Sequence, residues 1–434
     1  MSDEPLPATN PADDLEGPSS TREPGRVGRL LRRMLVPALA VFTALVIGAL
    51  VIVLSDQALL GLYVSDPLKA LADSVKAVAD GYGALITGAL GNPETYVEAF
   101  SSGDIDRIVK AFNPISEVLL AATPLIFTGL AVALGFRSGL FNIGAEGQLY
   151  VGAILATFVG FSLHGLPLFV HLPLAVAAGF LGGALWGFVP GFLKARTGAH
   201  EVIVTIMMNY VSYQLVIWVL RQSWYQRPGR SDPVSPVVDP AAVIPPIIDG
   251  LRLNWGFVLA LVAAAFVSWL LFRSTLGFEF RAVGLNPSAA RYAGMSISKT
   301  LVLTMAVCGG LAGLAGTTEI LGVTKALTPG FSPGYGFDGI AIALLGGSTP
   351  LGVVLSALLF GALRAGATPM QAATGIPIDL VVVIQALVIM FVAAPALVRE
   401  LYRIRTIEMR IAQRAPSARV SWSAPQNAHT PAMR

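Results

Sequence analysis

The sequence predicts an all-α, polytopic membrane protein. Hydrophobic residues make up 54% of its 434 residues and charged residues only 13%, against roughly 25% charged residues in soluble proteins. Apolar runs alternate with polar segments, and a run of about 20 apolar residues is long enough to cross a bilayer. Glycine is abundant, with 45 residues, which fits the close helix packing of membrane proteins.

The N-terminal part divides into three segments. Residues 1–33 are rich in Pro, Asp, Glu and Ser and end in arginines, which predicts a disordered cytoplasmic tail. Residues 34–54 are apolar throughout and form the first predicted transmembrane helix, which is too long and too far from the start for a cleaved signal peptide. Residues 55–113 carry many charges and predict an extracytoplasmic segment with short amphipathic helices. A solvated spacer, a lid and a docking surface all remain open for it.

Residues 114–398 contain the remaining apolar runs and form the main predicted transmembrane domain, followed by a basic cytoplasmic tail at 399–434. The predicted spans of this domain are 115–134, 149–165, 172–193, 202–220, 254–272, 301–321, a broken pair at 339–345 and 351–367, and 378–397. With the first helix this makes about ten transmembrane helices. Lys and Arg gather in the short loops of one side, which predicts that both termini are cytoplasmic. Glycines at 309, 310, 313 and 316 predict close helix contact in the span 301–321.

Several classes of function are excluded by missing patterns. The chain has no Gly-rich phosphate loop for ATP, no Ser elbow and no metal-ligand spacing. We therefore expect no enzyme activity, no cofactor and no metal site. The basic residues flank membrane helices instead of forming one patch, which argues against nucleic acid as a partner.

A polar stretch interrupts the apolar runs at 136–151. It contains Asn142, Glu146 and Gln148 among glycines. A carboxylate at membrane depth is costly and needs a partner, a cavity or a function. Two interpretations stay open: a solvated turn with Glu146 at a helix start, or a buried Glu146 held by Asn142 or by a backbone amide. Other polar residues at membrane depth, which do not have the spacing of a proton relay, are Asn209, Glu319, Asp338, Arg364 and Gln385.

A second motif lies in the polar stretch 281–294. Asn286-Pro287 is a helix start with Pro at the first helical position, and Gly294 can end the short helix. We expect Ala289 and Ala290 to keep the outer face of this helix small. An interfacial helix of no special role and a contact site for a cytoplasmic partner both fit the pattern.

Four motifs in order, 141–148, 201–210, 284–294 and 339–352, resemble a bacterial ABC-importer permease. The group is that of the branched-chain amino acid, ribose and simple-sugar permeases, and the nucleoside (basic-membrane-protein-type) permeases are the nearest branch. The resemblance covers residues 115–397. His200 stands where the family more often has Asn. The resemblance implies a translocation path near Asn142, Glu146, Gln148 and Asn209. It also implies an ATPase-coupling helix that contains Gly284, Asn286, Pro287, Ala289, Ala290 and Gly294.

The resemblance implies a multi-pass permease of the bacterial inner membrane that moves a small polar solute. A nucleoside is the solute that it favours most. The implied partners are a second permease subunit, like or unlike, a cytoplasmic ABC ATPase that hydrolyses the ATP, an extracytoplasmic solute-binding (lipo)protein and membrane lipid. A simple-sugar or branched-chain amino acid permease, an ion-coupled secondary carrier and a non-transporting scaffold are the alternatives. The sequence leaves the solute and the identity of the second permease open.

Overall fold

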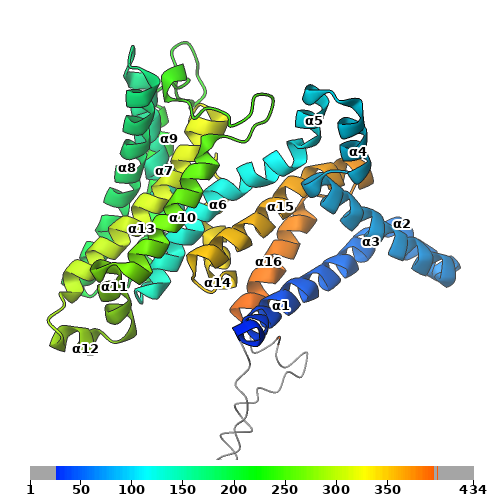
Figure 1. Cartoon of the computed structure of the whole chain (residues 1–434), viewed down its shortest axis with the longest axis horizontal. Coiled ribbons are helices and arrows are strands. Elements are labelled where there is room, and N and C mark those ends of the chain that lie inside the picture. Colours follow the sequence, from blue (N-terminus) through cyan, green and yellow to red (C-terminus); the bar gives the residue numbers. More distant parts are fainter. Residues whose placement is uncertain (1–25, 395–397, 399–434) are drawn as a thin grey trace, which may run out of the picture.

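A computed structural model describes residues 26–394 and 398 (Figure 1), and every regular element in this part of the chain is a helix. Seven of these helices are long and apolar enough to cross a membrane. They are α1 (Arg26–Ser55), α6 (Asn113–Arg137), α8 (Leu168–Thr197), α9 (Glu201–Leu220), α10 (Trp255–Arg273), α13 (Ile297–Glu319), which continues as a π-helical turn at Ile320–Thr324, and α15 (Pro350–Thr374). The prediction of an all-helical, polytopic membrane protein is confirmed.

The other predicted spans correspond to shorter helices. These are α7 (Ala145–Ser162), α14 (Tyr335–Leu345) and α16 (Asp379–Ala393). With 11 residues, α14 is too short to cross a bilayer at 1.5 Å of rise per residue. It forms the first half of the predicted broken pair, with α15 as the second half. The described residues therefore contain seven long apolar helices against about ten predicted spans.

The N-terminal third differs from its prediction in two places. Residues 26–33, predicted as part of the disordered tail, belong to α1. The segment 55–113 contains α2 (Gln57–Ser65), α3 (Pro67–Leu90), α4 (Pro93–Ser102) and α5 (Ile105–Ala111). Of these, α3 packs on α15, where a side chain at Gly88 would lie 2.7 Å from Pro369. A free solvated spacer is therefore wrong for α3. The predicted tail 399–434 lies outside the described residues.

The tightest helix packing joins α8 to α13. A Cβ atom added at Gly183 would lie 2.1 Å from the carbonyl oxygen of Gly309, and one added at Gly187 would lie 2.3 Å from that of Met305. The backbones are in direct contact, as small residues allow in membrane helices. The predicted close contact of Gly309 and Gly313 is confirmed, and we call this contact the glycine seam, made of Gly179, Gly183, Gly187, Gly309 and Gly313.

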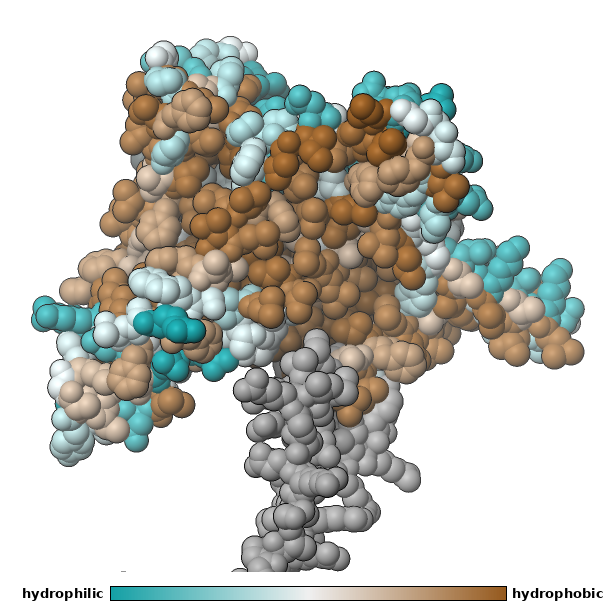
Figure 2. Space-filling model, in the orientation of Figure 1, coloured by the Kyte–Doolittle hydropathy of each residue, from teal (hydrophilic) through white to brown (hydrophobic). Residues whose placement is uncertain are grey.

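The face of the molecule drawn in Figure 2 has a broad apolar zone. Figure 2 shows hydrophobic residues across the middle of the molecule and hydrophilic residues at its upper and lower ends. Two further helices, α11 (Thr275–Leu285) and α12 (Pro287–Tyr292), lie at the lower end in Figure 1. The loop between α9 and α10 and the first turns of α6 lie at the opposite end. A polar site near the start of α6 is thus remote from α12.

Candidate functional site

The loop between α6 and α7 is held by a pair of side-chain amides. Nδ2 of Asn142 donates to Oε1 of Gln148 at 2.9 Å, and Nε2 of Gln148 donates back to Oδ1 of Asn142 at 3.2 Å. The same Oδ1 accepts from the backbone N–H of Gly144. Both side chains are fully buried. Buried polar groups need such partners, so this pair fixes the shape of the loop.

Asn209 attaches this loop to α9. Its Oδ1 accepts from the backbone N–H of Gly147 at 2.9 Å, and its Nδ2 donates to the carbonyl oxygen of Ile143 at 3.0 Å. A Cβ atom at Gly147 would lie 2.8 Å from that same Oδ1, so glycine is needed there for the close approach. The structure thus brings Asn209 next to the stretch that holds the other three predicted residues.

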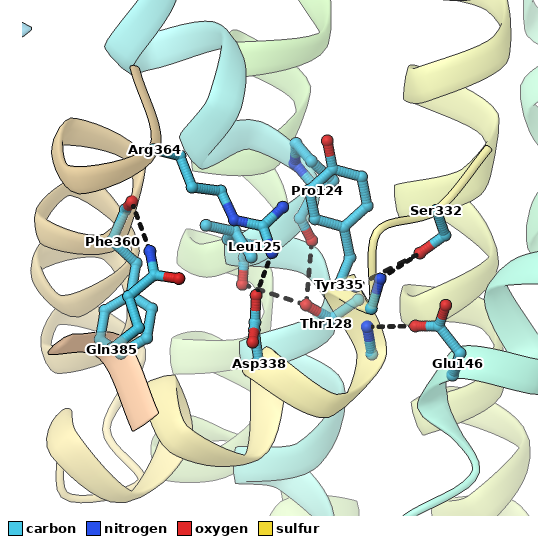
Figure 3. Close-up of polar contacts among 12 residues, drawn as sticks. Pro124, Leu125, Thr128, Glu146, Ser332, Tyr335, Asp338, Phe360, Arg364 and Gln385 are labelled. Carbon is cyan, nitrogen blue, oxygen red and sulfur yellow. Dashed lines mark hydrogen bonds and ion pairs between the residues drawn. The ribbon is translucent and has the colours of Figure 1, made fainter. Parts of the chain in front are cut away.

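Glu146 connects the same loop to α14. Its side chain is only 6% exposed, and its Oε2 accepts from the backbone N–H of Gly336 at 2.6 Å (Figure 3). The prediction of a buried, hydrogen-bonded Glu146 is confirmed with a backbone amide, and Asn142 is not the donor. The solvated turn is wrong. A carboxylate is favourable here because it meets the positive end of the α14 dipole.

The four predicted pathway residues are therefore engaged within the protein. Each is at most 8% exposed, and each forms the internal hydrogen bonds just described. None of them lines the cavity described below. Their geometry suits the positioning of the loop between α6 and α7 and of the first turn of α14.

A second polar cluster lies at the first turn of α14. Arg364 of α15 forms an ion pair with Asp338 at 2.5 Å, and its guanidinium lies 4.9 Å from the ring centroid of Tyr335. Figure 3 shows the Arg364 side chain reaching from α15 toward both residues. Glu319, the last residue of α13, interacts with the Tyr335 hydroxyl. Three ionisable side chains from three helices thus meet at one place.

This cluster borders a cavity of about 520 Å³. At its rim, Nη1 of Arg252 donates to Oε2 of Glu117 at 3.1 Å, which joins the loop before α10 to the first turn of α6. The first turns of α6 and the loop before α10, which border the cavity, lie at the end of the molecule opposite to α12 (Figure 1). The walls of the cavity come from α3, α6, α13, α14 and α15, and its polar or ionisable lining residues are Asn113, Glu117, Arg252, Glu319, Tyr335, Arg364 and Thr368.

The sequence contains a partial signal for this second cluster. Glu319, Asp338 and Arg364 are ionisable residues within apolar runs, which marks functional positions in membrane proteins. Their proximity was not visible, because the ion pair joins residues 26 positions apart on separate helices. Arg252 lies in the polar stretch before the predicted span 254–272 and Glu117 in the predicted span 115–134, and the pattern predicts no role for either; the two are 135 positions apart.

The predicted helix at 286–294 is present as α12. The Asn286 side chain accepts from the N–H of Ala289 at 3.0 Å, Pro287 is the first helical residue, and Gly294 has a φ of 83°. One expectation was wrong: Ala290 is buried, 3% exposed, and faces the body of the protein. The hydrophobic residues that face outward are Leu285, 86% exposed, and Tyr292, 95% exposed. The outward face of α12 therefore carries larger side chains than expected.

Gly284 allows α11 and α12 to pack on the loop after α6. A Cβ atom at Gly284 would lie 2.6 Å from the carbonyl carbon of Ser138, and one at Gly139 would lie 2.9 Å from the Cα of Gly284. Gly139 also has a φ of 70°, which favours glycine. The end of α11 therefore rests directly on the loop that holds Asn142 and leads to Glu146 in the first turn of α7.

Residues 115–393 match the family described as the permease component of the branched-chain amino acid transport system. This match covers more than half of the chain. The chain belongs to this family. It is a multi-pass membrane permease component of the ABC-importer type, in which the ATPase is a separate subunit.

Three curated relatives are similar over most of their length. The guanosine ABC transporter permease protein NupP of Bacillus subtilis is 39% identical over 85% of this chain and 95% of its own. The nucleoside ABC transporter permease protein NupB of Lactococcus lactis is 37% identical over 64% of this chain and 79% of its own. The glucose ABC transporter permease protein TsgB13 of Haloferax volcanii is 36% identical over 68% of this chain and 80% of its own.

A second guanosine permease protein of Bacillus subtilis, NupQ, is 27% identical over 59% of this chain. One organism thus has two permease proteins named for guanosine, and this chain is more similar to the first of them. No solved structure gives a significant match to the chain.

Proposed function

We propose that the chain is the permease subunit of an ATP-driven importer that moves a nucleoside into the cytoplasm, and guanosine is the leading candidate. The observation that carries this is the similarity to NupP, which extends over 95% of that guanosine permease protein. NupB, a nucleoside permease protein, agrees. A simple sugar is the second candidate because TsgB13 is named for glucose.

The proposal gives α12 the role of the helix that docks on the ATPase. Leu285 and Tyr292 expose large apolar surfaces at the two ends of a short capped turn. Aromatic and apolar residues of this kind form the centres of protein interfaces. Ala290 is buried, so it packs α12 against the permease and does not face the ATPase. The shape of the helix is set by Gly284, Asn286, Pro287, Ala289 and Gly294.

The loop between α6 and α7 then has a role in transmitting movement. Gly284 rests on Gly139, and Glu146 bonds to Gly336 in the first turn of α14. A displacement of α12 by the ATPase would therefore be passed to α14 through contacts between backbones. Asn142, Gln148 and Asn209 keep this loop stiff enough to pass it on. We assign them a positioning role beside the translocation path.

The proposed assembly contains two unlike permeases. The pair of guanosine permease proteins in Bacillus subtilis favours a NupQ-like partner over a second copy of this chain. The ATPase lies in the cytoplasm with residues 1–33 and 399–434. A solute-binding (lipo)protein delivers the nucleoside from the outer side, where we place residues 55–113. We place both termini in the cytoplasm, which is the orientation in which α12 meets the ATPase.

Uptake of radiolabelled guanosine tests the function. The chain is expressed with its partner permease, ATPase and binding protein in cells that lack other nucleoside transporters. We expect guanosine uptake that is lost when the ATPase is deleted. Uptake that persists without the ATPase and stops with an ionophore would establish the ion-coupled carrier instead. Uptake of glucose with none of guanosine would establish the sugar permease.

A further inference from the structure

We propose that the charged cavity beside α14 is a binding site for a neutral nucleoside on its way through the permease, with Arg364 and Glu319 as its main polar contacts. The inference rests on the proposed function and adds the site and its chemistry. It starts from the cost of charge at membrane depth, which proteins accept mainly where a side chain lines a pathway or binds a ligand. Glu319, Arg364 and the nearby Asp338 are such groups, and the first two line the cavity.

An ion pair that holds two helices together explains only part of this cluster. The pair Asp338–Arg364 joins α14 to α15, but Glu319 forms no ion pair with a described residue. It lies in the electrostatic field of Arg252 and Arg364 without bonding to either. Its carboxylate has about four acceptor positions, and the Tyr335 hydroxyl is the partner it has among the described residues. Further acceptor capacity therefore faces the cavity, and a polar solute would use it.

The orientation of Arg364 prepares it to donate. Asp338 engages one terminal nitrogen at 2.5 Å, and the Tyr335 ring lies beside the guanidinium. A guanidinium has five N–H donors, so further donors remain for a ligand. Arginine pairs with the O6 and N7 acceptors of guanine, and carboxylates accept from the N–H and O–H groups of a base or a ribose. Asp338 acts here as a positioning residue.

The charges select against anions. The cluster and rim contain the carboxylates of Glu117, Glu319 and Asp338 and the guanidiniums of Arg252 and Arg364. With three negative and two positive groups, the site has no excess of positive charge for a phosphate. A neutral nucleoside is therefore accepted, and a nucleotide is disfavoured by the carboxylates.

Size and position agree with this use. A volume of about 520 Å³ lies within the range of small-molecule sites. The wall includes Val323 of the π-helical turn that follows Glu319, and such turns occur often at functional sites. The first turns of α6 and the loop before α10, which border the cavity, lie at the end opposite to α12 (Figure 1), which is the side that receives solute from the binding protein in the proposed orientation.

The first test is guanosine uptake by Arg364→Lys and Glu319→Gln, with Arg230→Lys as the matched control. Arg230 also forms an ion pair, with Asp232, but lies exposed in the loop after α9. We expect uptake at low guanosine to fall roughly tenfold in the two site variants, because Arg364→Lys loses the planar fork of donors and Glu319→Gln loses the charge on its acceptor. The control should transport normally, and the amount of assembled complex should be equal in all three.

The second test needs no loss of a polar contact. Thr368→Cys places a thiol in the cavity wall, and the native Cys308 is fully buried. An external, membrane-impermeant maleimide should label Thr368→Cys more slowly with guanosine-loaded binding protein than with the unloaded protein. Ser231→Cys in the exposed loop should show no such difference. Glucose and guanosine monophosphate should give no protection.

The outcomes separate this inference from the proposed function. If the wild type takes up no guanosine, the proposed function fails. If the wild type takes up guanosine while Arg364→Lys and Glu319→Gln match it, the site is overturned and the function stands. Equal labelling of Thr368→Cys with loaded and unloaded binding protein would also overturn the site, whatever the uptake variants show.

Discussion

Helix α13 belongs to two regions that differ in every physical respect. Along most of its length it forms the glycine seam with α8, where the two backbones touch and no charged side chain intervenes. At its end it carries Glu319 and the π-helical turn at the charged cavity. The seam is dry and closely packed, whereas the cavity holds charged groups and open volume.

The difference separates the part that keeps its shape from the part that acts on the solute. Backbone contact at the seam leaves no space for adjustment, so α7, α8 and α13 should move together as one body. The cavity is bordered by α14, which is short, follows a glycine (Gly334) and is held at Gly336 by Glu146. Movement between the two regions is therefore expected at α14.

Breaking the seam should have the largest effect. Gly183→Leu inserts a side chain where even a Cβ atom would lie 2.1 Å from the Gly309 oxygen. Overpacking costs about 1–3 kcal/mol in ordinary cores, and a backbone contact that cannot yield belongs at the top of that range. We expect little folded protein in mild detergent, measured by size-exclusion chromatography.

Gly83→Leu is the matched control for the seam, because no atom lies within 4 Å of an added Cβ atom there. It should leave the yield of folded protein unchanged. Equal yields of the two variants would show that the seam is not the rigid part of the molecule.

Breaking the link between the regions should have an intermediate effect. Glu146→Leu leaves the buried N–H of Gly336 without its acceptor, which costs about 1–3 kcal/mol. Glu146→Gln keeps an oxygen that can accept this bond and should be milder. Thermal unfolding of the purified complex and guanosine uptake should both rank wild type first, Glu146→Gln second and Glu146→Leu last. A Glu146→Leu protein with normal stability and transport would remove the proposed link.

The remote docking surface should give the smallest effect. Tyr292→Ala removes an aromatic side chain that is 95% exposed on α12, so folding should not change. Binding to the ATPase should weaken by roughly 1–2 kcal/mol, as for an aromatic contact in an interface, measured by titration of the detergent-solubilised permease with ATPase.

Tyr210→Ala is the control for α12, since Tyr210 is also exposed, at 68%, but lies on α9. It should bind the ATPase as the wild type does. The corrected orientation adds a sharper readout: Ala289→Cys should cross-link to the ATPase, and the buried Ala290→Cys should not. Cross-linking of Ala290→Cys alone would reverse the faces of α12.

The two regions also differ in how far the sequence predicted them. The seam was visible because glycines recur along one helix, and α12 was visible because Asn286-Pro287 and Gly294 lie close together in the chain. The cavity was not, since Arg252 and Glu117 meet from 135 positions apart. The donor to Glu146 comes from 190 positions away. The inward face of Ala290 depends on packing against the rest of the protein, which a six-residue motif does not encode. The charges of α3 concealed its packing on α15.

The central claim is that the nucleoside passes through the charged cavity while the seam stays closed. The most direct measurement is an electron cryomicroscopy structure of the complete importer with guanosine, trapped before ATP hydrolysis. We expect solute density in contact with Arg364 and Glu319, and we expect the α8–α13 contact to be unchanged from the solute-free complex. Guanosine density elsewhere in the membrane domain, with only water beside Arg364, would contradict it.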